Sequence, residues 1–292
     1  MRIIRAQSLG MCFGVRDAIA LAVRHADAGL TILGDLVHNP AVLEGLRDKG
    51  IAIAHDAAQV QTATVMVTAH GASDRALAST RSRGLKVVEA TCPLVHVAHR
   101  AVKALVRDGY HPVIIGHRAH VEVRGMTDDL ADFDVVLDED DVARLDSRPR
   151  IGIASQTTQS IERVRHLVAL IRRRFPQSDI RFIDTVCRPT KDRQNAARDL
   201  ARQSDVVIVV GGSHSNNTRE LANTCGLSCS RVHLVQTASD LRPEWFRGTG
   251  VVGITAGTST PDDVIDRVEW RIRELSAAIH EDRTADAAEA DR

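Results

Sequence analysis

Three cysteines share one local sequence frame, in which an apolar, strand-like run precedes the cysteine and a helical pattern follows it. They are Cys12, Cys92 and Cys187. A cysteine at a helix N-terminus faces unpaired N–H groups and the positive end of the helix dipole, which favour the thiolate that metal ions bind. The repetition therefore predicts three equivalent thiolates, although their spacing matches no local metal-binding motif.

Loops that follow the strand-like runs are rich in neutral hydrogen-bonding side chains. Open α/β sheets bind ligands beyond the carboxyl ends of their strands, where helix N-termini present N–H groups to anions. No Walker motif or dinucleotide fingerprint occurs in its required setting. A diphosphate could instead be held by backbone N–H groups, hydroxyls, amides and imidazoles, although each loop taken alone also fits ordinary helix capping. The loops are 36–39, 67–71, 115–122, 154–158, 210–218 and 254–260.

Glu122 follows His120 by two residues in one of these loops. In an enclosed pocket it would be the natural general acid, with His120 as its proton partner, whereas on the surface it would be an ordinary solvated carboxylate. Other candidates receive structural interpretations. We interpret isolated histidines as hydrogen-bonded turn residues, and two further cysteines as small buried hydrophobes whose C-x3-C spacing leaves a metal pair open. These are His25, His55, His99, His166, Cys225 and Cys229.

Strand-like runs alternate with helical patterns along the chain, which is typical of an α/β protein with largely parallel sheets. The runs form three groups, each with one cysteine frame, and predict three small α/β domains over 1–95, 96–187 and 188–278. The last helix should have Thr260 as N-cap and Pro261 at its first helical position, and 279–292 should be a disordered tail. The predicted strands are 2–6, 30–33, 63–68, 85–89, 112–116, 134–137, 150–154, 179–183, 206–210, 231–235 and 250–254.

Composition narrows the class of protein. The 292 residues are 43% hydrophobic, and 38 basic side chains balance 38 acidic ones, so no global field attracts nucleic acid or anionic lipid. Five cysteines are an odd and sparse count for a disulfide scaffold, which favours reduced thiols. No run approaches the roughly 20 apolar residues of a membrane helix, and no signal-peptide pattern opens the chain. We therefore expect a cytoplasmic enzyme without nucleic-acid or membrane partners.

Taken in order, the motifs resemble those of 4-hydroxy-3-methylbut-2-enyl diphosphate reductases, the IspH or LytB family. Each motif alone is weak, but the ordered set, spread over residues 1–275, is specific. The matching motifs are Gly10-Met11-Cys12-Phe13-Gly14-Val15, Val37-His38-Asn39, Ala69-His70-Gly71, Ala90-Thr91-Cys92-Pro93-Leu94-Val95, His120-Val121-Glu122-Val123, Gln156-Thr157-Thr158, Cys187 with Arg193-Gln194, Ser215-Asn216-Asn217 and Thr255-Ala256-Gly257-Thr258-Ser259-Thr260-Pro261-Asp262.

The resemblance implies a pseudo-threefold trefoil of α/β domains around a central 4Fe-4S cluster. Cys12, Cys92 and Cys187 would hold it, and one iron without a protein ligand would bind the substrate hydroxyl. The implied reaction is reductive dehydration of 4-hydroxy-3-methylbut-2-enyl diphosphate to isopentenyl and dimethylallyl diphosphate, the last step of the methylerythritol phosphate pathway. A ferredoxin or flavodoxin would donate electrons to a monomer or weak dimer.

The resemblance also implies roles for individual side chains. Glu122 would supply protons with His120 beside it, and Thr157 would orient the substrate hydroxyl and relay protons. The residues implied to hold the diphosphate are His38, His70, His120, Ser215, Asn217 and Ser259, and Asn216 stands beside them at a position that is often serine.

The chain departs from the family pattern at Met11, Val121, Met126 and Arg188-Pro189. These changes bear on the shape of the substrate pocket. A related reductase that acts on a different allylic diphosphate is therefore an alternative function for this chain. The three cysteines alone would also permit a catalytically silent iron–sulfur redox sensor. Retention of Glu122, Thr157 and the diphosphate loops argues against a sensor, because a sensor needs no proton donor beside a phosphate site.

Overall fold

The computed structural model describes the backbone of residues 1–290 and the side chains of residues 1–279. In this part of the chain, twelve strands form three four-stranded sheets, and every strand pair is parallel. Parallel sheets are buried on both faces and favour continuous runs of β-branched residues. The run Val206–Val210, whose five residues are all buried, illustrates this.

The first sheet has the order β1-β12-β10-β11, the second β3-β2-β4-β5 and the third β7-β6-β8-β9. The strands of the first sheet are β1 (Arg2–Arg5), β10 (Val206–Val210), β11 (Val232–Val235) and β12 (Val251–Ala256). Those of the second are β2 (Leu30–Leu33), β3 (Ala52–Ala54), β4 (Thr64–Val67) and β5 (Lys86–Glu89). Those of the third are β6 (His111–Ile115), β7 (Asp134–Val136), β8 (Arg150–Ser155) and β9 (Asp179–Phe182).

The three sheets repeat one topology. In each sheet, one central strand (β10, β2 or β6) lies between the next strand in sequence and a second central strand (β12, β4 or β8). The second central strand also pairs with an edge strand that precedes a cysteine. In the first sheet that edge strand is β1, which pairs with β12 from Arg2↔Val251 to Arg5↔Ile254. The sequence grouped β1 with residues 30–89, and the structure corrects this. β1 closes the sheet of residues 206–256, as β5 and β9 close theirs.

The chain divides into two compact units. One comprises Met1–Cys12 and Lys191–Arg292, and the other Phe13–Thr190. The first unit contains the sheet with β1, and the second contains the other two sheets.

Ten α-helices and four short 3₁₀ helices connect the described strands. Asn39, Ser73, Ser160 and Ser215 cap helices by accepting hydrogen bonds from first-turn N–H groups. The helices are α1 (Phe13–Arg24), α2 (Pro40–Arg47), α3 (Asp74–Ser82), α4 (Pro93–Arg107), α5 (Val121–Thr127), α6 (Glu139–Ala143), α7 (Ile161–Arg174), α8 (Arg188–Ala201), α9 (Asn216–Gly226) and α10 (Asp262–Ala290), with η1 (Ala26–Ala28), η2 (Ala57–Gln59), η3 (Ala238–Asp240) and η4 (Pro243–Phe246).

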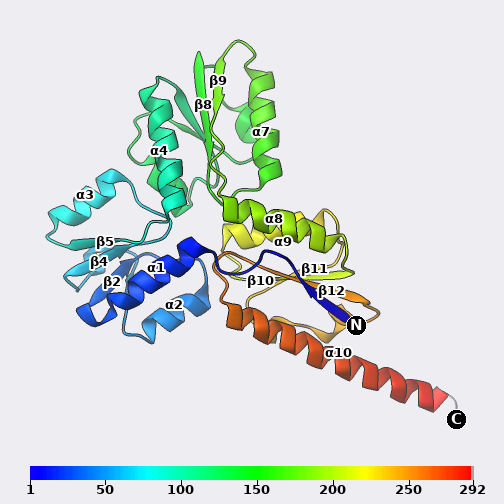
Figure 1. Cartoon of the computed structure of the whole chain (residues 1–292). Coiled ribbons are helices and arrows are strands. Elements are labelled where there is room, and N and C mark those ends of the chain that lie inside the picture. Colours follow the sequence, from blue (N-terminus) through cyan, green and yellow to red (C-terminus); the bar gives the residue numbers. More distant parts are fainter. Residues whose placement is uncertain (291–292) are drawn as a thin grey trace. The chain divides into compact units, whose positions relative to one another are not determined.

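Helices cover both faces of the first and third sheets. Figure 1 shows α4 and α7 on opposite sides of β8, where Leu105 of α4 and Leu167 of α7 belong to separate apolar clusters. In the other unit, Val268 of α10 packs on one face of the first sheet and Leu221 of α9 on the other. This burial fixes the strands and leaves the loops at their carboxyl ends to carry polar side chains.

Two details differ from the sequence-based expectation. The sequence missed β3, because its three residues, Ala-Ile-Ala, have little strand propensity. Thr260 is not the N-cap of α10 and Pro261 is not its first residue, because the helix begins at Asp262. The Thr260 hydroxyl instead donates to the carbonyl of Val210. The backbone of α10 continues to Ala290, while the side chains of 280–292 and the backbone of 291–292 lie outside the described residues. Disorder of the tail at 279–292 therefore stays a prediction.

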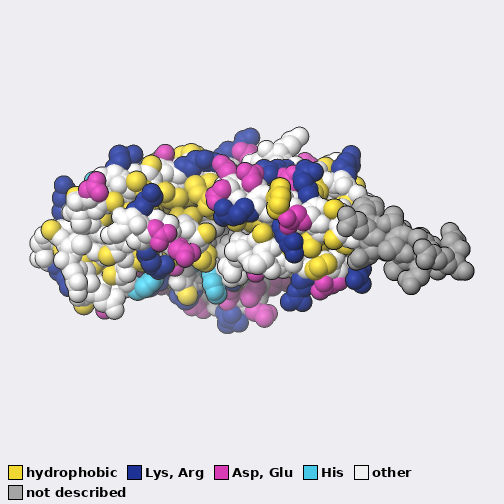
Figure 2. Space-filling model, turned by 90° about the horizontal axis from the view of Figure 1, so that it is seen from below, with side chains coloured by type: hydrophobic (Ala, Val, Ile, Leu, Met, Phe, Trp, Pro, Cys, Tyr) yellow, Lys and Arg dark blue, Asp and Glu magenta, His cyan; other side chains and the backbone are white. Residues whose placement is uncertain are grey.

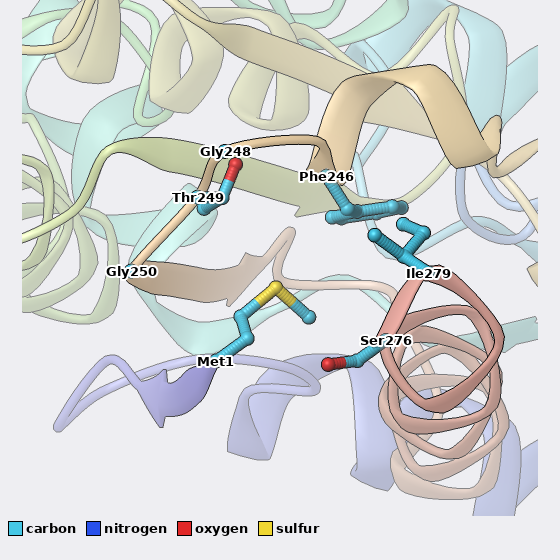
Figure 3. A pocket seen from close by; sticks show the side chains of 7 residues that line it. All are labelled: Met1, Phe246, Gly248, Thr249, Gly250, Ser276 and Ile279. Atoms are coloured by element: carbon cyan, nitrogen blue, oxygen red, sulfur yellow. The ribbon is translucent and has the colours of Figure 1, made fainter. Parts of the chain in front are cut away.

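Acidic and basic side chains are interspersed over the face seen in Figure 2. Within the described residues, no helix is both long enough and apolar enough to cross a membrane. A pocket of about 250 Å³ lies where β1 and β12 begin, at the amino ends of these strands (Figure 3). It contains none of the candidate residues, and is lined by Met1, Phe246, Gly248, Thr249, Gly250, Ser276 and Ile279.

Candidate functional site

Each of the three cysteines is held by the same backbone hydrogen bond. The N–H groups of Cys12, Cys92 and Cys187 donate to Thr258, Ala69 and Thr157 respectively, and each N···O distance is 3.0 Å. In each case the acceptor lies in the loop after the strand that pairs with the cysteine's own strand. The strand, cysteine and helix order predicted from the sequence is present at all three positions.

The thiols are reduced and half-buried, so each is accessible to a ligand. Cys92 is the N-cap residue of α4, and Cys187 directly precedes α8. A Cβ added to Gly14 in the first turn of α1 would lie 2.5 Å from the Cys92 sulfur, so only glycine lets α1 approach this thiol. The sulfur of Cys187 lies 3.1 Å from the hydroxyl of Thr190. By contrast, Cys225 and Cys229 are buried among apolar residues, as expected.

Three histidines meet in the unit formed by Phe13–Thr190. His38 follows β2, His70 follows β4 and His120 follows β6. The rings of His38 and His70 stack with centroids 4.3 Å apart, and the ring of His120 lies 5.1 Å from the first and 5.5 Å from the second. One nitrogen from each ring lies within 4.8 Å of the others. Such a triad can hold either a divalent metal ion or the oxygens of an anion.

The surroundings of the triad favour the uncharged form of His70 when no ligand is bound. Burial, followed by the nearby His38 and His120, lowers the pKa of His70 well below its usual value. Bound phosphate oxygens would oppose this effect and favour the charged imidazole. The Nδ1 atom of His120 accepts the N–H of Glu122 at 3.1 Å, so its Nε2 atom carries the proton when the ring is neutral and can donate.

Glu122 is enclosed, which selects the acid interpretation over that of a solvated carboxylate. The residue is 1% exposed and lies in the first turn of α5. The N–H of Thr157 donates to Oε1 at 2.6 Å, and the Thr157 hydroxyl donates to Oε2 at 3.0 Å. Burial raises the pKa of Glu122 to about 7, while the two bonds from Thr157 act in the opposite direction. Glu122 is therefore poised to release a proton near neutral pH.

Thr157 connects this acid to a cysteine. Its N–H binds the carboxylate of Glu122, and its carbonyl accepts the N–H of Cys187. The loop is fixed further by the buried Gln156, whose Oε1 atom accepts the N–H of His117 at 3.2 Å. One residue thus holds the candidate proton donor and a candidate metal ligand in a fixed relation.

The other unit brings together the remaining polar residues predicted from the sequence. Ser215 caps α9, and Asn216 and Asn217 form its buried first turn. A Cβ on Gly257 would lie 2.2 Å from the hydroxyl oxygen of Thr218, so the loop before Ser259 packs directly on α9. Ser259 itself is buried.

Several buried polar atoms of this unit have no hydrogen-bond partner within the described protein, so a ligand or water would have to satisfy them. Among the described residues, they include both amide atoms of Asn217 and the hydroxyls of Thr218 and Thr255. Such groups are costly in a folded protein unless a ligand or water satisfies them. Thr218 and Thr255 were not singled out from the sequence, where threonines beside strand ends are ordinary capping residues.

Comparison with known proteins gives one consistent result. A family model described as LytB protein matches residues 3–273. A 4-hydroxy-3-methylbut-2-enyl diphosphate reductase from Pelobacter propionicus is 38% identical over 279 residues, which cover 94% of this chain and 99% of that protein. A protein of the same name from Methylibium petroleiphilum is 40% identical, over 94% of this chain and 86% of that protein.

Solved structures agree. The chain is similar to an (E)-4-hydroxy-3-methyl-but-2-enyl diphosphate reductase described as the terminal enzyme of the non-mevalonate pathway, with a TM-score of 0.67 and 35% identity over 94% of this chain and 100% of that one. It also matches the reductase from Plasmodium falciparum, with a TM-score of 0.85 and 25% identity over 91% of this chain and 86% of that one. The predicted α/β fold with three parallel-sheet units is confirmed, and the chain belongs to the LytB family.

Proposed function

We propose that this chain reduces 4-hydroxy-3-methylbut-2-enyl diphosphate to isopentenyl and dimethylallyl diphosphate, the last step of the methylerythritol phosphate pathway. The observation that carries the proposal is the buried Glu122, whose pKa of about 7 suits a proton donor and whose partner Thr157 also holds Cys187. Family membership supplies the substrate class.

A 4Fe-4S cluster with one iron lacking a protein ligand is the cofactor we propose. Cys12, Cys92 and Cys187 would hold it, and they suit the group because all three are reduced, half-buried and placed at equivalent ends of edge strands. When bound, the cluster would supply two electrons and a Lewis-acidic iron for the substrate hydroxyl. A ferredoxin or flavodoxin is the proposed electron donor.

The diphosphate would be held by the loops that carry the three histidines and by the loops that carry the serines and asparagines. The imidazoles of His38, His70 and His120 form one group of donors. In the other unit, the hydroxyls of Ser215 and Ser259 and the amides of Asn216 and Asn217 would supply further donors, aided by the N-terminus of α9. The unpartnered atoms of Asn217 support this assignment, because phosphate oxygens would satisfy the amide N–H groups.

Proton delivery is assigned to Glu122 and Thr157. The reaction consumes two electrons and two protons, one proton leaving with the hydroxyl as water and one going to an allylic carbon. Glu122 would provide protons from its carboxyl group. The Thr157 hydroxyl, 3.0 Å from that carboxyl, would orient the substrate hydroxyl and pass protons to it.

The first test is an anaerobic assay on cluster-reconstituted protein with 4-hydroxy-3-methylbut-2-enyl diphosphate and a reduced viologen. We expect substrate-dependent viologen oxidation that yields both five-carbon diphosphates. Absence of turnover in protein with a spectroscopically confirmed cluster would overturn the proposal in favour of a redox sensor. Turnover only with another allylic diphosphate would overturn the substrate and direct attention to Val121, Met126 and Arg188.

Thr157→Val tests the link between Thr157 and the acid. Valine keeps the shape and the backbone N–H bond but removes the hydroxyl that stabilises the carboxylate of Glu122. We expect the pKa of Glu122 to rise, which moves the alkaline limb of the kcat/KM profile upward by roughly half a pH unit to one unit, the equivalent of one hydrogen bond. The profile is measured in the viologen assay, and an unmoved limb would show that this hydroxyl does not act on the acid.

A further inference from the structure

Within the unit formed by Phe13–Thr190, a small joint packs the loop that carries His70 against the helix that carries Glu122. We define this joint as Gly71 and Ala72 of the loop, His99 of α4, Gly125 of α5 and Asp129, which follows α5. The joint lies behind two groups of the proposed site, one that would hold the diphosphate and one that would donate protons. Its geometry therefore affects how these two groups face each other.

The ring of His99 lies close to both glycines of the joint. A Cβ added to Gly125 would lie 3.2 Å from Cε1 and 3.4 Å from Nε2 of His99, and one added to Gly71 would lie 3.4 Å from the same Nε2. The Nε2–Cε1 edge of the imidazole thus lies against both the loop and α5. The Gly125 Cβ would also lie 3.5 Å from the backbone of Ala72, so loop and helix meet directly beside the ring.

Asp129 connects the His70 loop and the end of α5 through hydrogen bonds. Its carboxylate accepts the N–H groups of Asp74 and Arg75, at 2.7 and 3.0 Å, in the first turn of α3, the helix that continues the His70 loop. The guanidinium of Arg75 donates in return to the carbonyl of Asp128. These bonds hold loop and helix together, and the His99 ring limits how closely they approach.

The contacts of His99 indicate a role in packing rather than in hydrogen bonding through Nε2. This nitrogen is buried and has no hydrogen-bond partner among the described residues. Burial, with smaller effects of His96 and Lys103, lowers the pKa of His99 to about 4, while Asp74 and Asp129 act in the opposite direction. At neutral pH the ring is therefore uncharged.

We propose that His99 is a positioning residue whose ring sets the spacing between the His70 loop and the Glu122 helix, and so aligns the acid with the bound diphosphate. This inference rests on the proposed function. It replaces the interpretation of His99 as an isolated turn histidine, because the residue lies within α4, beside the His70 loop and α5.

Two substitutions that change side-chain size at the joint, made singly and together, test the proposal. Gly125→Ala should push α5 away from the ring and lower kcat by roughly 10–100-fold, the effect of misplacing a catalytic group by about 1 Å. His99→Ala removes the ring, so the double variant should be more active than Gly125→Ala alone. If the two losses simply multiply, the ring does not set the spacing and the proposal is overturned.

His99→Phe separates ring shape from the nitrogen. Because Nε2 of His99 has no hydrogen-bond partner among the described residues, the phenylalanine variant should preserve most of the activity that His99→Ala loses. A phenylalanine variant as impaired as the alanine variant would overturn the spacing role of the ring in favour of a role for the imidazole nitrogen. His166→Ala is the matched control, since that histidine is exposed and pairs with Glu139 on the surface.

The pH profile of kcat distinguishes positioning from loss of folded protein. Misalignment of Glu122 should move the alkaline limb in His99→Ala at unchanged cluster content, whereas partial unfolding would lower the amplitude alone and overturn the proposal. Failure of the proposed function is distinguishable, because the wild-type chain would then show no turnover. Turnover with identical profiles in wild type and His99→Ala would contradict only the role of His99.

Discussion

Glu122→Gln should lower turnover of 4-hydroxy-3-methylbut-2-enyl diphosphate by roughly 10²–10⁴-fold, the usual contribution of a positioned general acid, while the iron–sulfur content stays unchanged. Glutamine has the shape of glutamate but no acidic proton. Its amide oxygen can accept the Thr157 N–H, and its NH₂ group can donate to the Thr157 hydroxyl oxygen, so both contacts of the buried carboxylate are preserved. The loss would therefore report chemistry rather than misfolding.

The measurement is the viologen assay, with cluster content followed by visible absorption. Glu139→Gln is a matched control, because Glu139 is an exposed carboxylate paired with His166. Turnover at the wild-type rate in Glu122→Gln would remove Glu122 from the mechanism and leave the protons to another donor.

The same variant should change how stability depends on pH. The pKa of Glu122 lies at about 7 in the folded chain, above its ordinary value of 4.5, so the folded state binds the proton more tightly than the unfolded state. Wild-type stability should therefore fall as pH rises from about 4.5 to about 7, by about 3 kcal/mol at most, and Glu122→Gln should escape this loss. Equal shifts of Tm with pH in both proteins would contradict the raised pKa.

Local patterns in the sequence predict most of the strands, because strands of buried parallel sheets are continuous apolar runs. Runs such as Val206–Val210 indicate their strands without ambiguity. The pairing of β1 with β12 does not follow from such patterns, since it joins the two ends of the chain. The cysteine frames contained the missing signal: Cys92 and Cys187 each follow the strand that closes a sheet, so the strand before Cys12 should close the sheet that lacks one.

The sequence pointed to candidate site residues where a side chain that can bind a ligand directly follows a predicted strand. The histidines after β2, β4 and β6 are examples. The sequence could not decide between an enclosed and a solvated Glu122, because burial depends on how α5 packs against the Thr157 loop. It also could not reveal His99, whose ring acts through contacts with two glycines distant in sequence. Gly71 directly after His70 and Gly125 three residues after Glu122 were the available hint that something approaches closely there.

Cys92→Ser should lose cluster and activity together. Serine is nearly isosteric with cysteine, so the N-cap position of α4, the backbone bond to Ala69 and the approach of Gly14 should persist. An alkoxide is a far harder and more basic ligand than a thiolate, and iron–sulfur clusters depend on thiolates. We expect the reconstituted variant to contain less iron and sulfide than wild type and to oxidise viologen at a rate reduced in at least the same proportion.

Cys225→Ser is the matched control, because it changes one sulfur in the same way at a site that cannot serve the cluster. Burial, with a smaller effect of Cys229, raises the pKa of Cys225 to about 12, and its sulfur lies 3.7 Å from the carbonyl of Ala197, a contact a serine hydroxyl can reproduce. Such a thiol is a poor source of thiolate, so this variant should keep both iron and turnover. If Cys92→Ser retains a full cluster and full activity, Cys92 is not a ligand, and the threefold equivalence of the edge-strand cysteines is a feature of the fold alone.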